Sequence, residues 1–237
     1  MINQFSRTEL LIGKEAVEKL HKSKVAVFGL GGVGGYVVEA LARSGVGSFV
    51  LVDNDRVSLT NLNRQIYALH STIGKFKTEV AKERILDINP DIEVELHNTF
   101  YSPDSVSEFD FAHYDYVVDA IDTVKAKLSL VEECQKVNTP IISSMGAGNK
   151  IEPLMFEVSD IYKTSVCPLA RVMRQELKKR KIPKLKVVYS KEEPAKISGE
   201  IEEKDENRRS IPASNAFVPP CAGLLIAKEV IFDLIKE

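Results

Sequence analysis

The sequence has few cysteines and no tryptophan. Its 237 residues include three cysteines, Cys134, Cys167 and Cys221, and no two of them form a CxxC pair. Cysteines spaced this widely indicate neither a disulfide framework nor a structural zinc site. We therefore expect a protein without zinc that works in a reducing compartment, the cytoplasm.

Long apolar runs and an excess of one charge are missing too. No stretch approaches the roughly 20 apolar residues of a membrane-spanning helix, and the N-terminus, polar from Asn3 onward, does not look like a signal peptide. The formal net charge is −2, which provides no general attraction to nucleic acid or to an anionic membrane. We expect no membrane partner, and any affinity for nucleic acid must come from a local patch.

Up to about residue 150, strand-like and helix-like segments alternate. Apolar or alternating stretches predict strands over 25–28, 49–52, 92–96, 116–120 and 140–143. Helical periodicity lies between them, in segments that end at Arg43, Ile88 and Val137. This order predicts an α/β fold with a doubly wound, mostly parallel Rossmann-like sheet and helices on both faces.

The pattern changes after Ile151. Further elements are expected there: strands over 154–158 and 185–189, a basic helix over 169–181 and an apolar helix over 221–235. Residues 191–212 are charged and poor in large apolar side chains, which predicts a mobile loop. We interpret 1–237 as a single nucleotide-binding domain, with its core over 1–150 and a substrate-side extension over 151–237.

A glycine-rich loop follows the first strand of this core. Gly29, Gly31 and Gly34 have GxGxxG spacing between a strand and a helix, where backbone amides can approach a phosphate. Asp53 ends the next strand, in position to accept hydrogen bonds from both ribose hydroxyls. These features predict a nucleotide site, and NAD and ATP share them.

Cationic and amide side chains beyond Asp53 separate the two nucleotides. One arginine stands among three amides, in the order Asn61, Asn63, Arg64 and Gln65. Breaking a phosphate bond builds charge on the phosphoryl oxygens, which Arg64 and a later helix-start cation, Lys77, can stabilise, whereas hydride transfer needs no such cluster. Asp122, just past the fourth strand, can hold Mg²⁺ through one carboxylate together with phosphates. The pattern therefore favours ATP with Mg²⁺.

These motifs resemble those of the ATP-dependent activating enzymes related to ThiF, MoeB and the ubiquitin-activating enzymes. The matching stretches are GLGGVG at 29–34, DNDRVSLTNLNRQ at 53–65, GKFK at 74–77 and DAID at 119–122. Arg7, within SRTELLIG, matches the family's N-terminal arginine. The resemblance covers residues 5 to about 150, and it implies a homodimer that adenylates a carboxylate and releases pyrophosphate.

The resemblance also implies roles for single residues. Asp53 would bind the ribose, Asp122 would ligate Mg²⁺, and Arg7 would reach the ATP of the neighbouring subunit. Catalysis is assigned to Arg7, Arg64, Lys77 and Asp122. The residues expected to contact the nucleotide are Gly29, Gly31, Gly32, Gly34, Asp53, Asp55, Asn61, Arg64, Gln65 and Lys77.

The second half looks like the branch of this family that dehydrates threonylcarbamoyladenosine in tRNA. The stretches are DIYKT at 160–164, CPLAR at 167–171 and VVYS at 187–190. Relatives that activate sulfur-carrier proteins usually carry paired CxxC motifs for zinc, which are missing here. A dehydratase needs no enzyme thiol, because a nucleophile of the same modified base can attack the activated carboxylate, with an effective molarity of roughly 10⁵ M or more. We expect Cys167 to be structural.

A basic segment supports an RNA substrate. Between residues 171 and 186, eight Lys and Arg residues stand against one acid, Glu176. On composition alone such a run is a solvated helix face, whereas phosphate contacts of a tRNA need clustered cations of this kind. The candidate tRNA-binding residues are Arg171, Arg174, Lys178, Lys179, Arg180 and Lys181.

Three alternatives stay open at this point. The chain could adenylate a ubiquitin-like sulfur-carrier protein, transfer hydride with NAD, or bind tRNA without catalysis. The sequence also leaves open whether AMP or ADP is the product and whether a sulfur-relay protein is a further partner.

Overall fold

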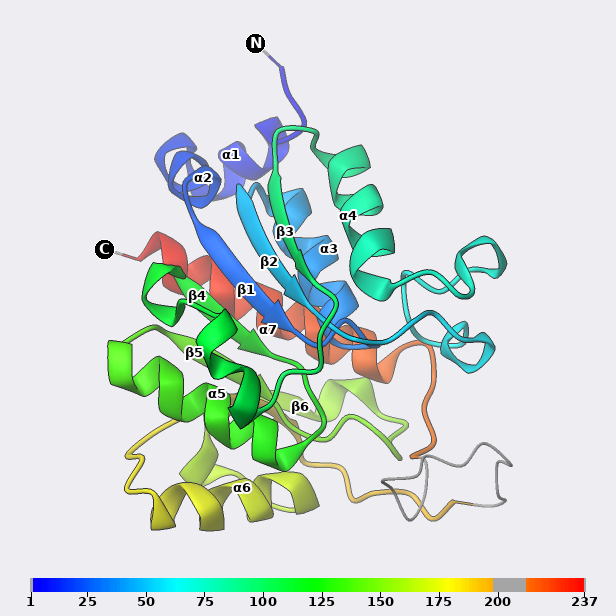
Figure 1. The fold of residues 1–237 in the computed structure, drawn as a ribbon, viewed down its shortest axis with the longest axis vertical. Coiled ribbons are helices and arrows are strands. Elements are labelled where there is room, and N and C mark those ends of the chain that lie inside the picture. Colours follow the sequence, from blue (N-terminus) through cyan, green and yellow to red (C-terminus); the bar gives the residue numbers. More distant parts are fainter. Residues whose placement is uncertain (1, 198–211, 237) are drawn as a thin grey trace.

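A computed structural model describes residues 2–197 and 212–236, which share a seven-stranded sheet in the order β3-β2-β1-β4-β5-β7-β6 (Figure 1). The strands are β1 Lys24–Phe28, β2 Ser48–Val52, β3 Glu93–His97, β4 Tyr116–Asp119, β5 Ile141–Ser144, β6 Phe156–Asp160 and β7 Lys186–Ser190. In the described chain, neighbouring strands are parallel except for the antiparallel pair β6 and β7. The predicted α/β fold with a mostly parallel Rossmann-like sheet is confirmed.

Helices cover both faces of this sheet (Figure 1). One layer holds α3 Gly34–Ser44, α4 Lys77–Ile88 and α7 Val218–Ile235, and the other holds α5 Val124–Val137 and α6 Pro168–Lys179. Along β1, Val25 and Val27 pack in the layer of α3 and α7, whereas Ala26 and Phe28 pack in the layer of α5. Burial on both faces explains why this strand is a continuous apolar run.

The direction in which strands are added reverses between β1 and β4, which are neighbours in the sheet. Open α/β sheets bind ligands at such a switch point, beyond the carboxyl ends of the strands. The loop that follows β1 requires glycine at two positions. A Cβ on Gly34 would lie 1.8 Å from the carbonyl oxygen of Gly29, and one on Gly29, whose φ is +90°, would lie 2.7 Å from that of Ala120. The glycine loop therefore lies directly against the residue that follows β4.

Several element boundaries differ from the predicted ones by a few residues, and two of these differences involve proline. Leu154 and Met155 lie in a 3-10 turn, η5 (Pro153–Met155), because proline starts such a turn readily and has no N–H for a strand ladder. The last helix begins at Val218 rather than at Cys221. Pro219 and Pro220 fit its first turn, where backbone N–H groups have no partner within the helix.

Part of the predicted mobile loop, 191–212, cannot be compared, because residues 198–211 lie outside the described residues. Within the described ranges, no helix combines the length and the apolar character needed to cross a lipid bilayer.

Candidate functional site

Asp53 and the glycine loop form the centre of the candidate site. β2 ends at Val52, so Asp53 lies at the carboxyl edge of the sheet beside the loop that follows β1. One of its carboxylate oxygens accepts the Leu30 N–H at 2.6 Å, and the other accepts the Asp55 N–H at 2.8 Å. Two main-chain donors thus fix the carboxylate and leave lone pairs on both oxygens, which ribose hydroxyls could use.

Lys77 provides positive charge next to this carboxylate. Its buried ammonium lies 2.6 Å from Asp55 Oδ2 and 4.0 Å from Asp53 Oδ1. Lys77 is also the first residue of α4, where helix N–H groups add positive potential. Burial raises the pKa of Asp53, while the charge of Lys77 and the two main-chain hydrogen bonds oppose that rise. Lys77 therefore counteracts the effect of burial on the pKa of Asp53.

The amides of the next loop serve different purposes. Asn61 Oδ1 accepts the Ser58 N–H at 3.2 Å, which closes the turn that contains Asn61. Gln65 is buried, and its Oε1 has no hydrogen-bond partner in the described part of the protein. A Cβ on Gly31 would lie 3.9 Å from Gln65 Nε2, so the side chain lies beside the glycine loop. A buried acceptor without a partner is costly, and a donor of a bound nucleotide could satisfy it.

Arg64 also lies against the glycine loop. A Cβ on Gly32 would be 3.3 Å from Arg64 Cγ. The guanidinium donates to the Thr60 carbonyl oxygen at 3.0 Å and to Asn63 Oδ1 at 2.9 Å. The structure therefore brings Arg64 and Gln65 to the glycine loop at the same sheet edge as Asp53 and Lys77.

Asp122 is exposed just beyond the end of β4, where it accepts a hydrogen bond from Thr123 Oγ1 at 3.3 Å. Among residues 2–197 and 212–236, no three His, Cys, Asp or Glu side chains group together as a metal site. Asp122 could therefore hold Mg²⁺ only together with oxygens of ATP and water, which is the usual way proteins bind this ion.

Asp119 forms a buried ion pair that the sequence analysis missed. It is completely buried and lies 2.9 Å from the ammonium of Lys127, a completely buried residue of α5. The ammonium also donates to Ser143 Oγ at 3.2 Å and to the Ser144 carbonyl oxygen at 2.7 Å, so its N–H donors are all used. A lysine among the apolar residues of α5 was the only signal for this pair in the sequence.

Arg7 is separated from the other predicted site residues. It is exposed on α1 (Ser6–Ile12), which lies at the edge where the strands begin (Figure 1). Phe5, directly before α1, packs against His21 with ring centroids 4.9 Å apart, and His21 ends α2 (Lys14–His21) just ahead of β1. The glycine loop lies at the opposite edge of the sheet, where the parallel strands end. Arg7 therefore does not join the site of its own chain.

A connecting segment, residues 212–217, was not predicted as part of the site. The Ser214 carbonyl oxygen accepts from Asn63 Nδ2 at 3.1 Å. Ala213 donates to Asn149 Oδ1 at 2.7 Å, and its carbonyl oxygen accepts the Asn149 N–H at 2.8 Å. The connecting segment thus joins the loop that carries Arg64 to the loop that follows β5. Contacts between segments this far apart leave no local pattern in the sequence.

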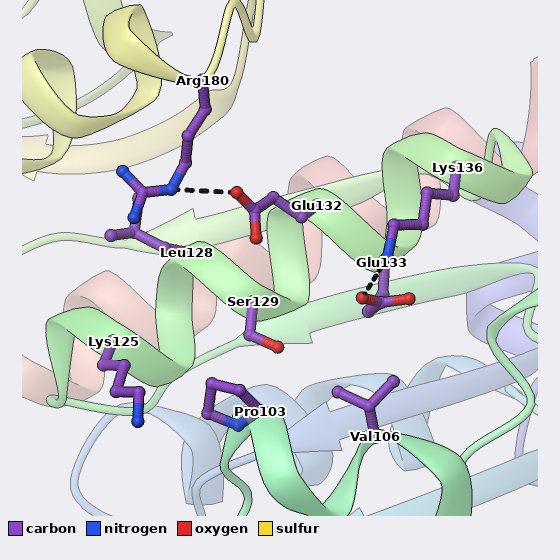
Figure 2. Close-up of a pocket in the computed structure, with 9 residues that line it drawn as sticks. All are labelled: Pro103, Val106, Lys125, Leu128, Ser129, Glu132, Glu133, Lys136 and Arg180. Atoms are coloured by element: carbon purple, nitrogen blue, oxygen red, sulfur yellow. Dashed lines mark hydrogen bonds and ion pairs between the residues drawn. The ribbon is translucent and has the colours of Figure 1, made fainter.

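The basic residues of α6 are partly neutralised. Glu176 lies 2.6 Å from both Lys179 and Arg180, the residue just after the helix, and Arg180 also pairs with Glu132 of α5 at 2.9 Å. Figure 2 shows this last pair at a pocket of about 360 Å³ between η3 (Pro103–Glu108), α5 and Arg180. Its lining mixes both charges and lies away from the glycine loop, so we do not assign the nucleotide to this pocket.

The other candidate tRNA-binding residues fall into two groups. Arg174 is half-buried and donates to the Thr164 carbonyl oxygen at 2.9 Å, so it holds the chain ahead of α6 in place. Among these candidates, Arg171, Lys178 and Lys181 are exposed and form no ion pair with the described residues.

The fold and the site define an α/β nucleotide-binding protein, in which a glycine loop, a buried aspartate and two cations meet at the switch point of a parallel sheet. The chain belongs to the ThiF family, which it matches over residues 5–232. This finding confirms the family predicted from the sequence.

Sequence relatives and a solved structure both identify the branch of the family to which the chain is similar. The tRNA threonylcarbamoyladenosine dehydratase of Bacillus subtilis (strain 168) is 47% identical over 245 residues, which cover 100% of this chain and 96% of the relative. The Escherichia coli (strain K12) protein of the same name is 41% identical over 175 residues, which span 74% of this chain and 65% of the relative. A crystal structure of E. coli tRNA N6-threonylcarbamoyladenosine dehydratase, TcdA, in complex with ATP has a TM-score of 0.88 at 32% identity and covers 98% of this chain and 93% of that chain. The predicted resemblance to the dehydratase branch is confirmed.

Proposed function

We propose that this protein is an ATP-dependent tRNA threonylcarbamoyladenosine dehydratase. The observation that carries this proposal is the full-length 47% identity to the B. subtilis dehydratase. The site supports it, because Asp53, Arg64 and Lys77 gather around the glycine loop at one edge of the sheet.

The proposed chemistry starts at the substrate carboxylate, which attacks the α-phosphate of ATP and releases pyrophosphate. Negative charge grows on the phosphoryl oxygens during this step, and Arg64 and Lys77 stabilise it from fixed positions. A nucleophile of the same modified base then attacks the acyl adenylate, loses its proton and expels AMP, so that the base has lost one water. The nucleophile and the activated carboxylate belong to the same modified base, so their proximity accelerates the ring closure and no thiol of the protein is needed. The E. coli dehydratase has been crystallised in complex with ATP and in complex with AMP, as expected for a site that converts one into the other.

Mg²⁺ belongs to the proposal as a partner of ATP. Asp122 is the residue that would hold it, because its exposed carboxylate lies beyond β4, next to the glycine loop after β1. When bound, Mg²⁺ neutralises charge on the phosphates. Omitting Mg²⁺ should abolish turnover, and Asp122→Asn should raise the Mg²⁺ concentration required for half-maximal rate.

A homodimer would explain the position of Arg7. On the same short helix, Leu10 and Leu11 are almost fully exposed, and exposed large apolar side chains are typical of interfaces. A second copy that covers these leucines can take Arg7 to its own nucleotide edge. If so, Arg7→Ala and Arg64→Ala should each be inactive alone, and mixing them should restore part of the activity through hybrid dimers. No recovery in a mixture that exchanges subunits would contradict action in trans.

The proposed substrate tRNA would use the exposed cations Arg171, Lys178 and Lys181, which lie on and just after α6. A sulfur-relay protein stays a predicted partner. The main alternative function is adenylation of a sulfur-carrier protein. Pyrophosphate exchange that requires the carrier would indicate this alternative.

The deciding experiment incubates the purified protein with ATP and a tRNA that contains threonylcarbamoyladenosine, followed by mass spectrometry of the nucleosides. We expect the modified nucleoside to lose the mass of one water, with AMP formed in equal amount. An unchanged nucleoside in the presence of ATP and Mg²⁺ would reject the proposal, and ADP in place of AMP would reject the adenylation step alone.

A further inference from the structure

Lys150 is a buried cation that the steps above do not use. It lies in the loop after β5, next in the sheet to β4, whose loop carries Asp122. The residue is 4% exposed, and its ammonium donates to the main-chain carbonyl oxygen of Glu192. An ammonium has three N–H donors. In the part of the chain that is described, this carbonyl is its single hydrogen-bond acceptor.

The carboxylate of Glu192 is committed elsewhere. It accepts the N–H of Ile151 at 2.8 Å and the N–H of Glu152 at 3.0 Å. Burial lowers the pKa of Lys150, and the groups that oppose this effect are the Cys167 thiol and Glu192. A buried cation without a paired carboxylate destabilises a fold, and binding of an anion compensates this effect.

The position of Lys150 is tied to the nucleotide side of the site. Asn215 Nδ2 donates to the Lys150 carbonyl oxygen at 2.8 Å. One residue earlier, the Ser214 carbonyl oxygen accepts from Asn63, whose own Oδ1 accepts from Arg64. The connecting segment therefore holds Lys150 and Arg64 in a set relation across the carboxyl edge of the sheet.

We propose that Lys150 binds the carboxylate of the threonylcarbamoyl group and presents it to ATP. This inference rests on the proposed dehydratase function, and it assigns to Lys150 the recognition of the one anionic group that distinguishes the modified base from adenosine. The ion pair forms as the modified base enters, and it gives the buried ammonium the direct carboxylate contact that it lacks within the described residues.

The test measures binding of two anticodon stem-loop RNAs, one with threonylcarbamoyladenosine and one with unmodified adenosine. The unsubstituted protein should bind the modified RNA roughly ten- to a hundredfold more tightly, as expected for a hydrogen-bonded charge pair. Lys150→Met should bind both RNAs alike and keep its affinity for ATP. Lys150→Arg, which retains the charge, should keep most of the preference, and Lys184→Met, an exposed lysine of the extension, should leave it unchanged.

Thermal unfolding separates binding from a structural role. Because Lys150→Met removes an uncompensated buried charge, its Tm should equal or exceed that of the unsubstituted protein. A retained preference for the modified RNA, or a lowered Tm, in Lys150→Met would overturn the inference. If the unsubstituted protein shows neither the preference nor dehydration, the proposed function itself fails.

Discussion

Near the strand ends of the core over 2–150, two cations, Lys77 and Lys127, are buried and paired with carboxylates, whereas the basic residues of α6 in the extension are mostly exposed. Asp119 and Lys127 are completely buried together, and Lys77 is buried beside Asp53. By contrast, Arg171 and Lys178 of α6 point to solvent without an ion pair in the described chain. The core therefore holds its cations in fixed positions before ATP arrives, and the extension leaves part of its positive charge available.

This difference matches what each half has to recognise. A transferred phosphoryl group develops charge at defined atoms, so stabilising it requires donors that do not reorganise during the step. An RNA backbone offers a repeating charge, and its attraction depends on the number of cations more than on their exact geometry. Disturbing the core should therefore cause larger losses than disturbing the extension.

The largest effect is expected from Lys127→Met. This change leaves Asp119 buried without its counter-ion, so the free energy of unfolding should fall by about 3–5 kcal/mol. Urea denaturation followed by circular dichroism measures the loss. Lys125→Met, at an exposed site of the same helix, is the matched control and should change stability little. Equal stability of the two variants would show that the buried pair is not a stabilising element of the core.

Lys77→Met is expected to act mainly on turnover. Loss of one fixed cation at a phosphoryl transition state lowers kcat by about 10²- to 10³-fold. Lys75→Met tests whether position matters, because Lys75 lies two residues earlier and forms only an exposed pair with Glu83 at 3.6 Å. Pyrophosphate release measured with both variants should show the loss for Lys77→Met alone. Similar rates for the two would remove Lys77 from the proposed phosphate site.

Features placed by local sequence were easier to predict than features that depend on contacts between distant segments, for a physical reason. The glycine loop, Asp53 and Lys77 are placed by strands and helices whose own residues encode them locally, so spacing alone located them. The Asp119–Lys127 pair, the connecting segment 212–217 and the burial of Lys150 depend on contacts between elements distant in the chain. Leu154 and Met155 are a different case, because the proline beside them is a local signal that outweighs their strand-like apolar character and places them in a turn.

The exposed cations on and just after α6 should contribute to tRNA binding through charge. Replacing Arg171, Lys178 and Lys181 with glutamine should weaken tRNA binding about tenfold and reduce the slope of log K against log salt by about 2–3. Binding isotherms over a range of salt concentrations measure both quantities. The control pair Lys179→Gln and Arg180→Gln should change the slope less, because Glu176 already neutralises these residues. Equal slopes for the two sets would mean that pairing does not decide which cations meet the RNA.

The smallest effect is expected for two similar charge clusters in different surroundings. Glu39 in the core pairs with Arg43 and Arg84 and its side chain is 11% exposed, whereas Glu176 in the extension pairs with Lys179 and Arg180 and is 28% exposed. Burial acts to raise the pKa of Glu39, but the hydrogen bonds from both arginines outweigh it and hold that pKa below 4.5. The pKa of Glu176 is lowered as well, by its hydrogen bonds to Lys179 and Arg180.

A lowered folded-state pKa stabilises the protein above the unfolded-state value, and this contribution disappears as pH falls through the folded-state value. Thermal unfolding between about pH 6 and pH 3 should therefore show that Glu39→Gln flattens the acid-side loss of stability, by about 1 kcal/mol, as expected for a partly buried charged hydrogen bond. Glu176→Gln should flatten it less, because water screens an exposed pair more strongly. The reverse order would mean that burial is not what distinguishes the charge pairs of the core from those of the extension.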